Sequence, residues 1–293
     1  MTSMRRIVAA TDFSPGSEAA VERAVQLAAA HGASLCLLHA FDASAWHSLM
    51  GAFDAQRLSA DPPLDVRMRQ RLVDAAAALA SQAGLEVEAQ FGVGSPESTI
   101  DSYVRAHAVS LAVVGSRADP EVAGLGSTAS KVVRAPACPV LIVRAPGSRP
   151  YDTVLSAVDL REGSIRAVTF ALTLFPAARH HLLYALDPAL DRAVWMGVFA
   201  KEQLQSLHES MHARADRELQ QFAQSLRARA LHPLTADVAD DLPARAILVG
   251  AAALPADCVV VGHHGEGTVV DSFLGNLAQH VIQYTTRDVL VVP

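Results

Sequence analysis

The 293-residue sequence predicts an α/β protein made of two doubly wound domains, each built on a parallel five-stranded sheet. Three observations predict this fold. Strand-like runs alternate with helix-like segments, the strand-like runs are apolar throughout, and the whole pattern occurs twice along the chain. Strands without polar alternation are typical of parallel sheets that helices cover on both faces.

The repeat appears as a constant offset between matching residues. Asp12 follows the run IVAAT and Asp159 follows VLSAV, 147 positions later. The same offset relates Gly16 to Gly163, Ser17 to Ser164, Pro96 to Pro243, and Gly115 to Gly262. It becomes 149 for Gly126 and Gly275, and stays at 149 for the last strand-like run. We therefore predict domains at 1–147 and 148–293, joined through the linker SRPYD at 148–152.

In the first repeat, Gly, Pro or Asp bounds each strand-like run. The expected strands are 6–10, 34–40, 87–91, 110–115 and 139–143. A helix is expected from an N-cap at Ser17 to a stop at Gly32, and a second helix ends at Gly84. A third helix is expected to begin with Ser95 as its cap and Pro96 in its first turn.

The second repeat follows the same plan with different residues. Its expected strands are 153–158, 181–185, 234–238, 258–262 and 288–292. A long middle helix is expected from about 199 to 229, and the last helix is expected to begin near Asn276.

Composition excludes several classes of protein. Hydrophobic residues make up 51% of the chain and charged residues 18%, which is typical of globular proteins rather than disordered ones. The net charge of −6 argues against binding to nucleic acid or to an anionic membrane surface. No apolar run approaches the roughly 18 residues of a membrane span, and the N-terminus lacks a signal-peptide pattern.

The three cysteines, Cys36, Cys138 and Cys258, stand alone in apolar runs and form no CxxC motif. This pattern indicates small buried side chains in a reducing compartment. We therefore expect a cytoplasmic location.

One glycine-containing segment, VVVGHHGEGTVVDSFLGN at 259–276, connects an expected strand to the last helix. Ligands of doubly wound sheets bind at the carboxyl ends of strands, where the strand order reverses. Gly262 and Gly265 would let the backbone approach a ligand and adopt positive φ, and a helix start near Gly275 favours an anion. The sequence lacks both GxxxxGK[ST] and a GxGxxG after its first strand, so the local pattern alone favours a simple strand-to-helix turn over a nucleotide site.

Several motifs together resemble the universal stress protein family. They are IVAATDFSPGSEAAVERAVQLA near the start, GVGSPESTI at 92–100, APACPVLIV at 135–143 and the spacing G-x2-G-x9-G in 262–275. The resemblance extends over both halves. It implies two Rossmann-like, adenine nucleotide alpha-hydrolase-like domains packed as a pseudo-dimer, with ATP lying across the strand ends.

The resemblance places a nucleotide site in the second repeat. There the carboxylate after the first strand faces the adenine side, and the glycine loop holds the phosphates. The implied residues are Asp159, Ala185, Gly262, His263, Gly265, Gly275 and Asn276.

This second site departs from the family pattern in three ways. Asn276 replaces a Ser or Thr, Asp241 replaces the glycine that corresponds to Gly94, and no Lys or Arg lies between 259 and 276. Phosphate binding would then depend on backbone donors and on Mg²⁺, which takes oxygen ligands from carboxylates and phosphates.

The corresponding site of the first repeat is predicted to be degenerate. Its loop between Gly115 and Gly126 is two residues shorter, with Ala118 at the second glycine position and Pro120 removing a backbone donor. The residues retained there are Asp12, Gly115, Gly126 and Ser127.

The segment HESMH at 208–212 fits the HExxH zinc motif. His208 and His212 would share one face of a helix, with Glu209 as a base. The surrounding sequence is polar and offers no third ligand at the usual spacing, so we interpret both histidines as solvent-exposed and predict no metal site.

The leading hypothesis is a stress-response protein that binds ATP in its second domain as a regulatory ligand. A nucleotide-free interaction module is the alternative, and a weak ATPase that uses Asp159 or Asp241 with Mg²⁺ is a third reading. The sequence contains no GxSxG elbow and no identifiable general base, so we predict that the protein is not an enzyme. Its expected partners are an adenine nucleotide and a protein partner or second copy.

Overall fold

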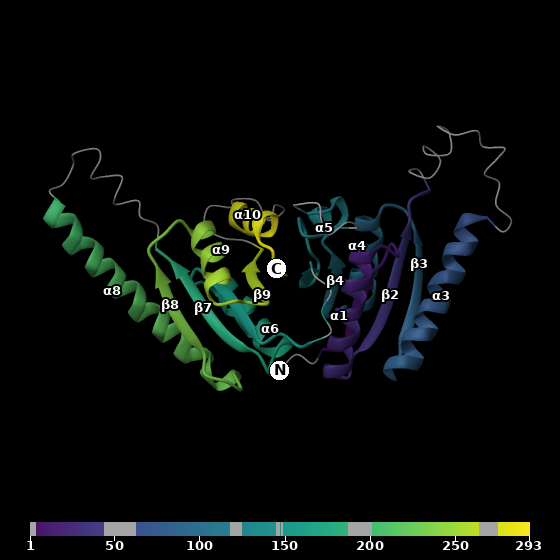
Figure 1. Ribbon diagram of the computed structural model, residues 1–293, viewed down its shortest axis with the longest axis horizontal. Helices are drawn as coiled ribbons and strands as arrows, with labels where there is room; N and C mark the ends of the chain where they lie inside the picture. Colours follow the sequence, from purple (N-terminus) through teal and green to yellow (C-terminus); the bar gives the residue numbers. More distant parts are fainter. Residues whose placement is uncertain are drawn as a thin grey trace. The chain divides into compact units, whose positions relative to one another are not determined.

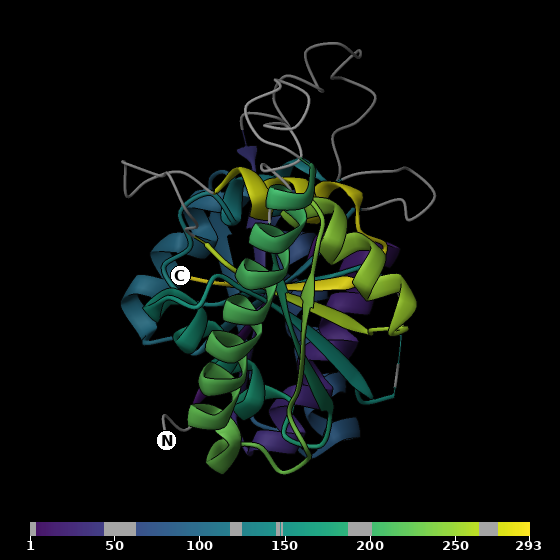
Figure 2. The same cartoon turned by 90° about the vertical axis from the view of Figure 1, so that its left-hand side faces the viewer.

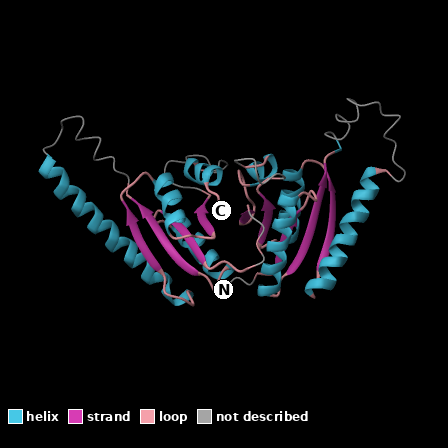
Figure 3. Cartoon of the chain, viewed as in Figure 1, coloured by secondary structure: helices cyan, strands magenta, loops and turns pink. Residues whose placement is uncertain are grey.

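The computed structural model describes residues 4–43, 63–117, 125–144, 147, 149–186, 201–263 and 275–293 (Figure 1). The chain divides into two compact units, Met1–Arg149 and Pro150–Pro293. Each unit alternates strands and helices in the way that the sequence predicts (Figure 3).

The first unit contains five parallel strands in the order β3-β2-β1-β4-β5. They are β1 (Arg6–Ala10), β2 (Ser34–Phe41), β3 (Val87–Val93), β4 (Leu111–Gly115) and β5 (Val140–Val143). The order runs outward from β1 to β3 and then returns to β4 beside β1. The reversal point of the sheet therefore lies between β1 and β4.

The helices of this unit are α1 (Pro15–His31), α3 (Leu64–Ala83), α4 (Pro96–His107) and α5 (Ser127–Val132). Right-handed crossovers put α1 and α3 on one face of the sheet and α4 and α5 on the other. The contacts of α1 with α3, and of α4 with α5, agree with this arrangement.

The second unit repeats the topology in the order β8-β7-β6-β9-β10. Its strands are β6 (Thr153–Val158), β7 (Arg179–Ala185), β8 (Thr235–Ala239), β9 (Cys258–Gly262) and β10 (Asp288–Val292). Its helices are α6 (Glu162–Leu174), α8 (Lys201–Leu226), the 3-10 turn η2 (Arg227–Arg229), α9 (Pro243–Ala253) and α10 (Asn276–Tyr284). The long α8 lies along β8 (Figure 2).

The helix ends follow simple capping chemistry, with one correction to the sequence analysis. The N-cap of α1 is Ser14, whose side chain accepts a hydrogen bond from the Ser17 amide, so the expected cap at Ser17 is wrong. Pro15 at the first helical position explains the earlier start, because it supplies the helical φ and needs no donor. Gly32 ends α1 in the left-handed conformation, with φ of 60°.

The boundary between the units lies two residues beyond the expected 147/148 division. The Arg23 guanidinium donates to the carbonyl of Arg149 at 2.8 Å, and the Gln26 amide donates to Gly147 at 3.3 Å. Helix α1 thereby holds the end of the first unit. Tyr151 is buried in the second unit, where its ring packs in a T-shaped arrangement with the Phe175 ring, at 4.9 Å between the ring centres.

No helix within the described ranges is long and apolar enough to span a bilayer. The three cysteines, Cys36, Cys138 and Cys258, are buried and form no disulfide. Burial raises the pKa of both Cys36 and Cys138 to about 12, so these two thiols stay protonated at neutral pH.

We predict that the native protein does not react with a colorimetric thiol reagent at pH 8 within minutes, because the thiolate is the reactive form and the thiols are buried. After unfolding in guanidinium chloride, the same assay should titrate three thiols per chain. Rapid reaction of the native protein would contradict the burial of Cys36 and Cys138.

Candidate functional site

A cavity of about 390 Å³ lies at the reversal point of the first sheet. The ends of β1, β2 and β4 and the starts of α1, α4 and α5 surround it. Its walls include all four residues of the predicted degenerate site: Asp12, Gly115, Gly126 and Ser127. A cavity of this size lies within the range of small-molecule sites, about 300–1,000 Å³.

Asp12 lies in a tight turn that leads from β1 into α1. Its carboxylate accepts hydrogen bonds from the Ser14 amide at 3.0 Å and the Ser14 hydroxyl at 2.5 Å. Partial burial raises the pKa of Asp12, but the hydrogen bonds from Ser14 and Ser17 outweigh burial and bring the pKa below its ordinary value. Asp12 is therefore an ionised hydrogen-bond acceptor at the cavity wall.

The turn is strained at the next residue. Phe13 has φ of 62°, in the left-handed region that bulky residues avoid. Such strain persists where the surroundings over-determine it, and it is found more often at functional sites than elsewhere.

The second unit carries the same turn. Leu160 has φ of 63°, and the Asp159 carboxylate accepts from the Arg161 amide at 3.1 Å and the Ser164 hydroxyl at 2.5 Å. Asp12 and Asp159 thus have equivalent settings, and each carboxylate also stabilises the turn before a helix.

The two glycine loops close through matching hydrogen bonds, although their lengths differ by two residues. In the first unit, the Gly126 amide donates to the Ser116 carbonyl at 2.6 Å. In the second unit, the Gly275 amide donates to the His263 carbonyl at 3.0 Å. The ends of both loops are therefore held alike. Gly265 and the rest of 264–274 lie outside the described residues.

Close packing explains the glycines of the first loop. A Cβ on Gly115 would lie 2.5 Å from the Gly16 carbonyl oxygen, and a Cβ on Gly126 would lie 2.7 Å from the Ser116 carbonyl oxygen. Among the described glycines, only Gly32, Gly84 and Gly94 have positive φ. The expected positive φ at Gly262 is therefore wrong.

The other predicted residues of the second site have different exposures. Gly262 ends β9, His263 is buried at 2% exposure, and Asn276 is exposed at the first position of α10. Ala185 ends β7 and pairs with Ala239. Strand register makes Ala185 the counterpart of Ala40, which lines the cavity of the first unit.

Asp241 has a structural role that the sequence did not indicate. Its carboxylate accepts from the Leu242 amide at 2.8 Å and pairs with Arg245 at 3.2 Å, at the start of α9. Arg245 thus offsets the negative charge expected to repel phosphate. The corresponding Gly94 has φ of 140°, whereas Asp241 does not have positive φ.

Arg117, which the sequence did not single out, is the one cationic side chain among the described residues of the cavity wall. Its guanidinium donates to the Leu125 carbonyl at 3.3 Å. Its position two residues after Gly115, at the end of a strand, was the available signal. Thr11, Ser14 and Thr128 add hydroxyl groups to the same wall.

The histidines of HESMH meet an acidic side chain. His208 and His212 lie 3.4 and 3.7 Å from the Asp240 carboxylate, which follows β8. Among the residues that the structure describes, no three His, Cys, Asp or Glu side chains are arranged to hold a metal ion. These contacts therefore join α8 to the end of β8.

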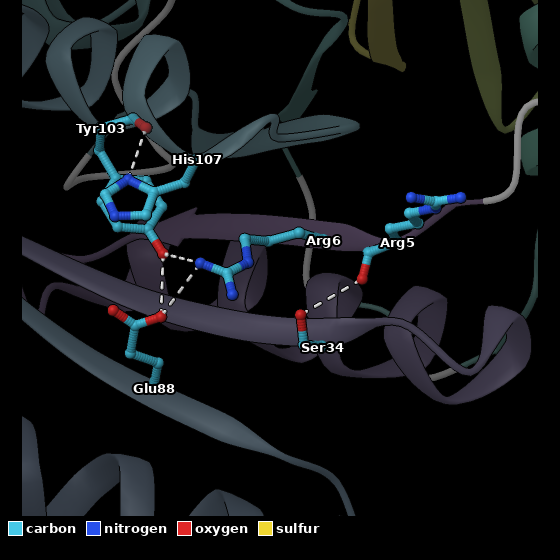
Figure 4. Close-up of polar contacts among 6 residues, drawn as sticks. All are labelled: Arg5, Arg6, Ser34, Glu88, Tyr103 and His107. Atoms are coloured by element: carbon cyan, nitrogen blue, oxygen red, sulfur yellow. Dashed lines mark hydrogen bonds and ion pairs between the residues drawn. The ribbon is translucent and has the colours of Figure 1, made fainter.

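A second polar cluster lies near the amino ends of the first unit's strands (Figure 4). Tyr103 donates to Glu88 at 3.1 Å and accepts from Arg6 at 3.2 Å, and Arg6 also pairs with Glu88 at 3.4 Å. The His107 ring stacks on Tyr103 at 4.1 Å. These side chains supply one another's hydrogen-bond partners and hold α4 to the sheet at the edge opposite the cavity.

The model of the universal stress protein family matches residues 4–144 and 150–293. The chain belongs to the universal stress protein family. A search of curated protein sequences finds no match.

Two solved structures that match nearly the whole chain agree on its fold. A universal stress protein from Archaeoglobus fulgidus is 18% identical, with a TM-score of 0.66 over 100% of this chain and 99% of that chain. A functionally unknown protein from Pseudomonas aeruginosa is 19% identical, with a TM-score of 0.67 over 99% of this chain and 92% of that chain. A universal stress protein in complex with cAMP is 23% identical and covers 49% of this chain and 98% of that chain, with a TM-score of 0.37.

We predict that Gly115→Ala destabilises this universal stress protein by about 1–3 kcal/mol, because the new methyl group meets backbone atoms that cannot move independently. Gly163→Ala is a matched control, since the nearest atom to its Cβ is a flexible Arg166 nitrogen at 3.9 Å. Urea denaturation of both variants measures the difference. Equal stability of the two variants would show that Gly115 is not needed for packing.

We predict that Asp12→Asn destabilises the protein at pH 7 and that this difference shrinks as the pH falls below about 4. The folded-state pKa of Asp12 is lowered, so its stabilising effect is present above the unfolded pKa and is lost as the pH falls through the folded pKa. Denaturation curves of both proteins at several pH values measure the difference. A difference that grows on acidification would contradict the hydrogen-bonded carboxylate.

Proposed function

We propose that this universal stress protein binds an adenine nucleotide, ATP, at the carboxyl ends of its strands as a regulatory ligand. The observation that best supports this proposal is the cavity of the first unit, whose wall includes Asp12, Gly126 and Ser127. A carboxylate can accept from the exocyclic amino group of adenine or from ribose hydroxyls.

Arg117 supports phosphate binding in the first unit. A guanidinium forms charge-assisted, bidentate hydrogen bonds with phosphate, and this cavity wall includes one. The intact glycine spacing of the second repeat favours a nucleotide site there. The chemistry of the described residues favours the first as well, so we propose nucleotide sites in both units.

The proposed second site consists of Asp159, Ala185, Gly262, His263, Gly265, Gly275 and Asn276. The matching turn at Asp159 and the matching closure of the loop at Gly275 support it. Because Arg245 already pairs with Asp241, Mg²⁺ is not needed to offset that carboxylate. Any Mg²⁺ would accompany the phosphates.

A regulatory role fits these sites better than turnover. Both Asp12 and Asp159 accept hydrogen bonds from their own turns, so neither carboxylate is poised to take a proton from water. We therefore propose binding without rapid hydrolysis.

One observation favours the alternative, a nucleotide-free interaction module. Gly115 and Gly126 are both explained by close backbone packing, without any ligand. The glycine pattern by itself does not distinguish a binding loop from a structural turn.

Isothermal titration calorimetry with MgATP tests the proposal on the full chain, in which two sites are expected. Arg117→Ala should weaken the first site by about 10-fold or more, since a hydrogen bond to a charged group contributes about 1.5–3 kcal/mol. Gly265→Val should impair the second site alone.

Arg214→Ala is the control for lost positive charge, because Arg214 pairs with Glu218 on α8 and does not line the cavity. The affinity of this variant for MgATP should equal that of the unmodified chain. An absence of binding at millimolar MgATP in the unmodified chain would reject the proposal and favour the interaction module.

A further inference from the structure

A stack of rings and guanidinium groups lies beside the Asp12 turn, outside the cavity wall. The Arg71 guanidinium lies 4.2 Å from the centre of the Phe13 ring, and the Phe13 ring lies 5.1 Å from the His39 ring. The His39 ring lies 5.7 Å from the Phe91 ring, and the Arg69 guanidinium lies 4.4 Å from the centre of the Phe91 ring. We call these five residues the arginine–aromatic stack. Both cation–ring distances are within the roughly 6 Å of a cation–π interaction.

Two residues of the stack contact the Asp12 turn, Phe13 and His39. Phe13 directly follows Asp12 and has the left-handed φ of 62°. Its amide donates to the Thr11 hydroxyl at 3.0 Å, and a His39 ring nitrogen lies 2.8 Å from the Thr11 carbonyl oxygen. That carbonyl can only accept, so His39 donates through Nδ1. The side chains of the stack therefore hold the backbone on both sides of Asp12.

The arginines of the stack come from a different element. Arg69 and Arg71 lie on α3, and within the described parts of the chain neither of them pairs with a carboxylate. Their described side-chain contacts are with the rings. Among the described residues, the contact that involves the Arg71 guanidinium is the one with the Phe13 ring.

The second unit has the same backbone turn, and among its described residues no cation–ring contact accompanies it. Leu160 has φ of 63°, but it packs with Tyr184 and Val238 against a buried apolar cluster that includes Leu219 and Phe222. Tyr184 and Val238 are the counterparts of His39 and Phe91 by strand register and repeat offset. The two units therefore stabilise one strained turn in two ways, by a cation on a ring and by apolar packing.

We infer that Arg71 is a positioning residue of the first site, which holds the Phe13 turn and thereby the Asp12 carboxylate from α3. This inference rests on the proposed function for its effect on nucleotide, but its structural part does not. It makes the first site, and not the second, dependent on a charged side chain of α3.

Amide hydrogen exchange tests the structural part without nucleotide. The Ser14 amide donates to Asp12, and its counterpart, the Arg161 amide, donates to Asp159. In Arg71→Met, which keeps length but removes charge, Ser14 should exchange about two- to fivefold faster, as loss of an exposed cation–π contact implies. Arg161 should be unchanged, and Arg71→Lys should restore slow exchange, because lysine retains the cation.

Arg67→Met is the matched control on the same helix, since no ring contact joins Arg67 to a described aromatic side chain. Its Ser14 exchange should match that of the unmodified chain. Equal exchange in Arg71→Met and Arg67→Met, or failure of Arg71→Lys to restore protection, would overturn the inference. Faster exchange at both Ser14 and Arg161 would also overturn it, because it would indicate general destabilisation.

A double-mutant cycle with MgATP tests the consequence for binding. Arg71→Met should weaken the first site two- to fivefold in the unmodified background and have no further effect in Asp12→Ala, because Arg71 acts through Asp12. Additive losses would overturn the positioning role. If the unmodified chain binds no MgATP, the proposed function fails, whereas the exchange experiment still decides whether Arg71 holds the turn.

Discussion

The candidate site of the first unit depends on the close approach of the end of β4 to the first turn of α1. The Gly16 carbonyl lies where a side chain on residue 115 would begin, so the strand end and the helix start meet backbone to backbone. This contact brings Asp12, at the end of β1, and Ser116, at the end of β4, to one cavity. The reversal of strand order between β1 and β4 then leaves space for a ligand at the carboxyl ends of these two strands.

The two units share a backbone plan and differ in the chemistry placed on it. Both have a carboxylate in a strained turn after the first strand, and both close the glycine loop through one amide-to-carbonyl hydrogen bond. The first unit adds Arg117 at the cavity and Arg71 beside the turn. The second has apolar packing around Leu160, and Arg245 pairs with Asp241. One fold thus accommodates two different arrangements of charged and apolar side chains.

The strands were the most predictable elements. Runs such as CVVVG and DVLVV are apolar at every position because both faces of a parallel sheet are covered, and β9 and β10 begin and end at the predicted residues. The start of α1 was predicted wrongly because both Ser14 and Ser17 are suitable N-cap residues. Ser14 is the N-cap, since Pro15 suits the first helical position. The Ser17 hydroxyl instead contacts Thr11 and the Asp12 turn.

The sequence by itself determined the repeat, the α/β class, the order of elements and the membership of the four retained residues in one region of the first unit. These properties follow from local periodicity and spacing, which are written along the chain. Only the tertiary structure decided that Arg117 lines the cavity, that Asp241 pairs with Arg245 and that Arg71 lies on Phe13. Such contacts join residues of separate elements or depend on side-chain direction, and neither is encoded in a one-dimensional pattern of residue types.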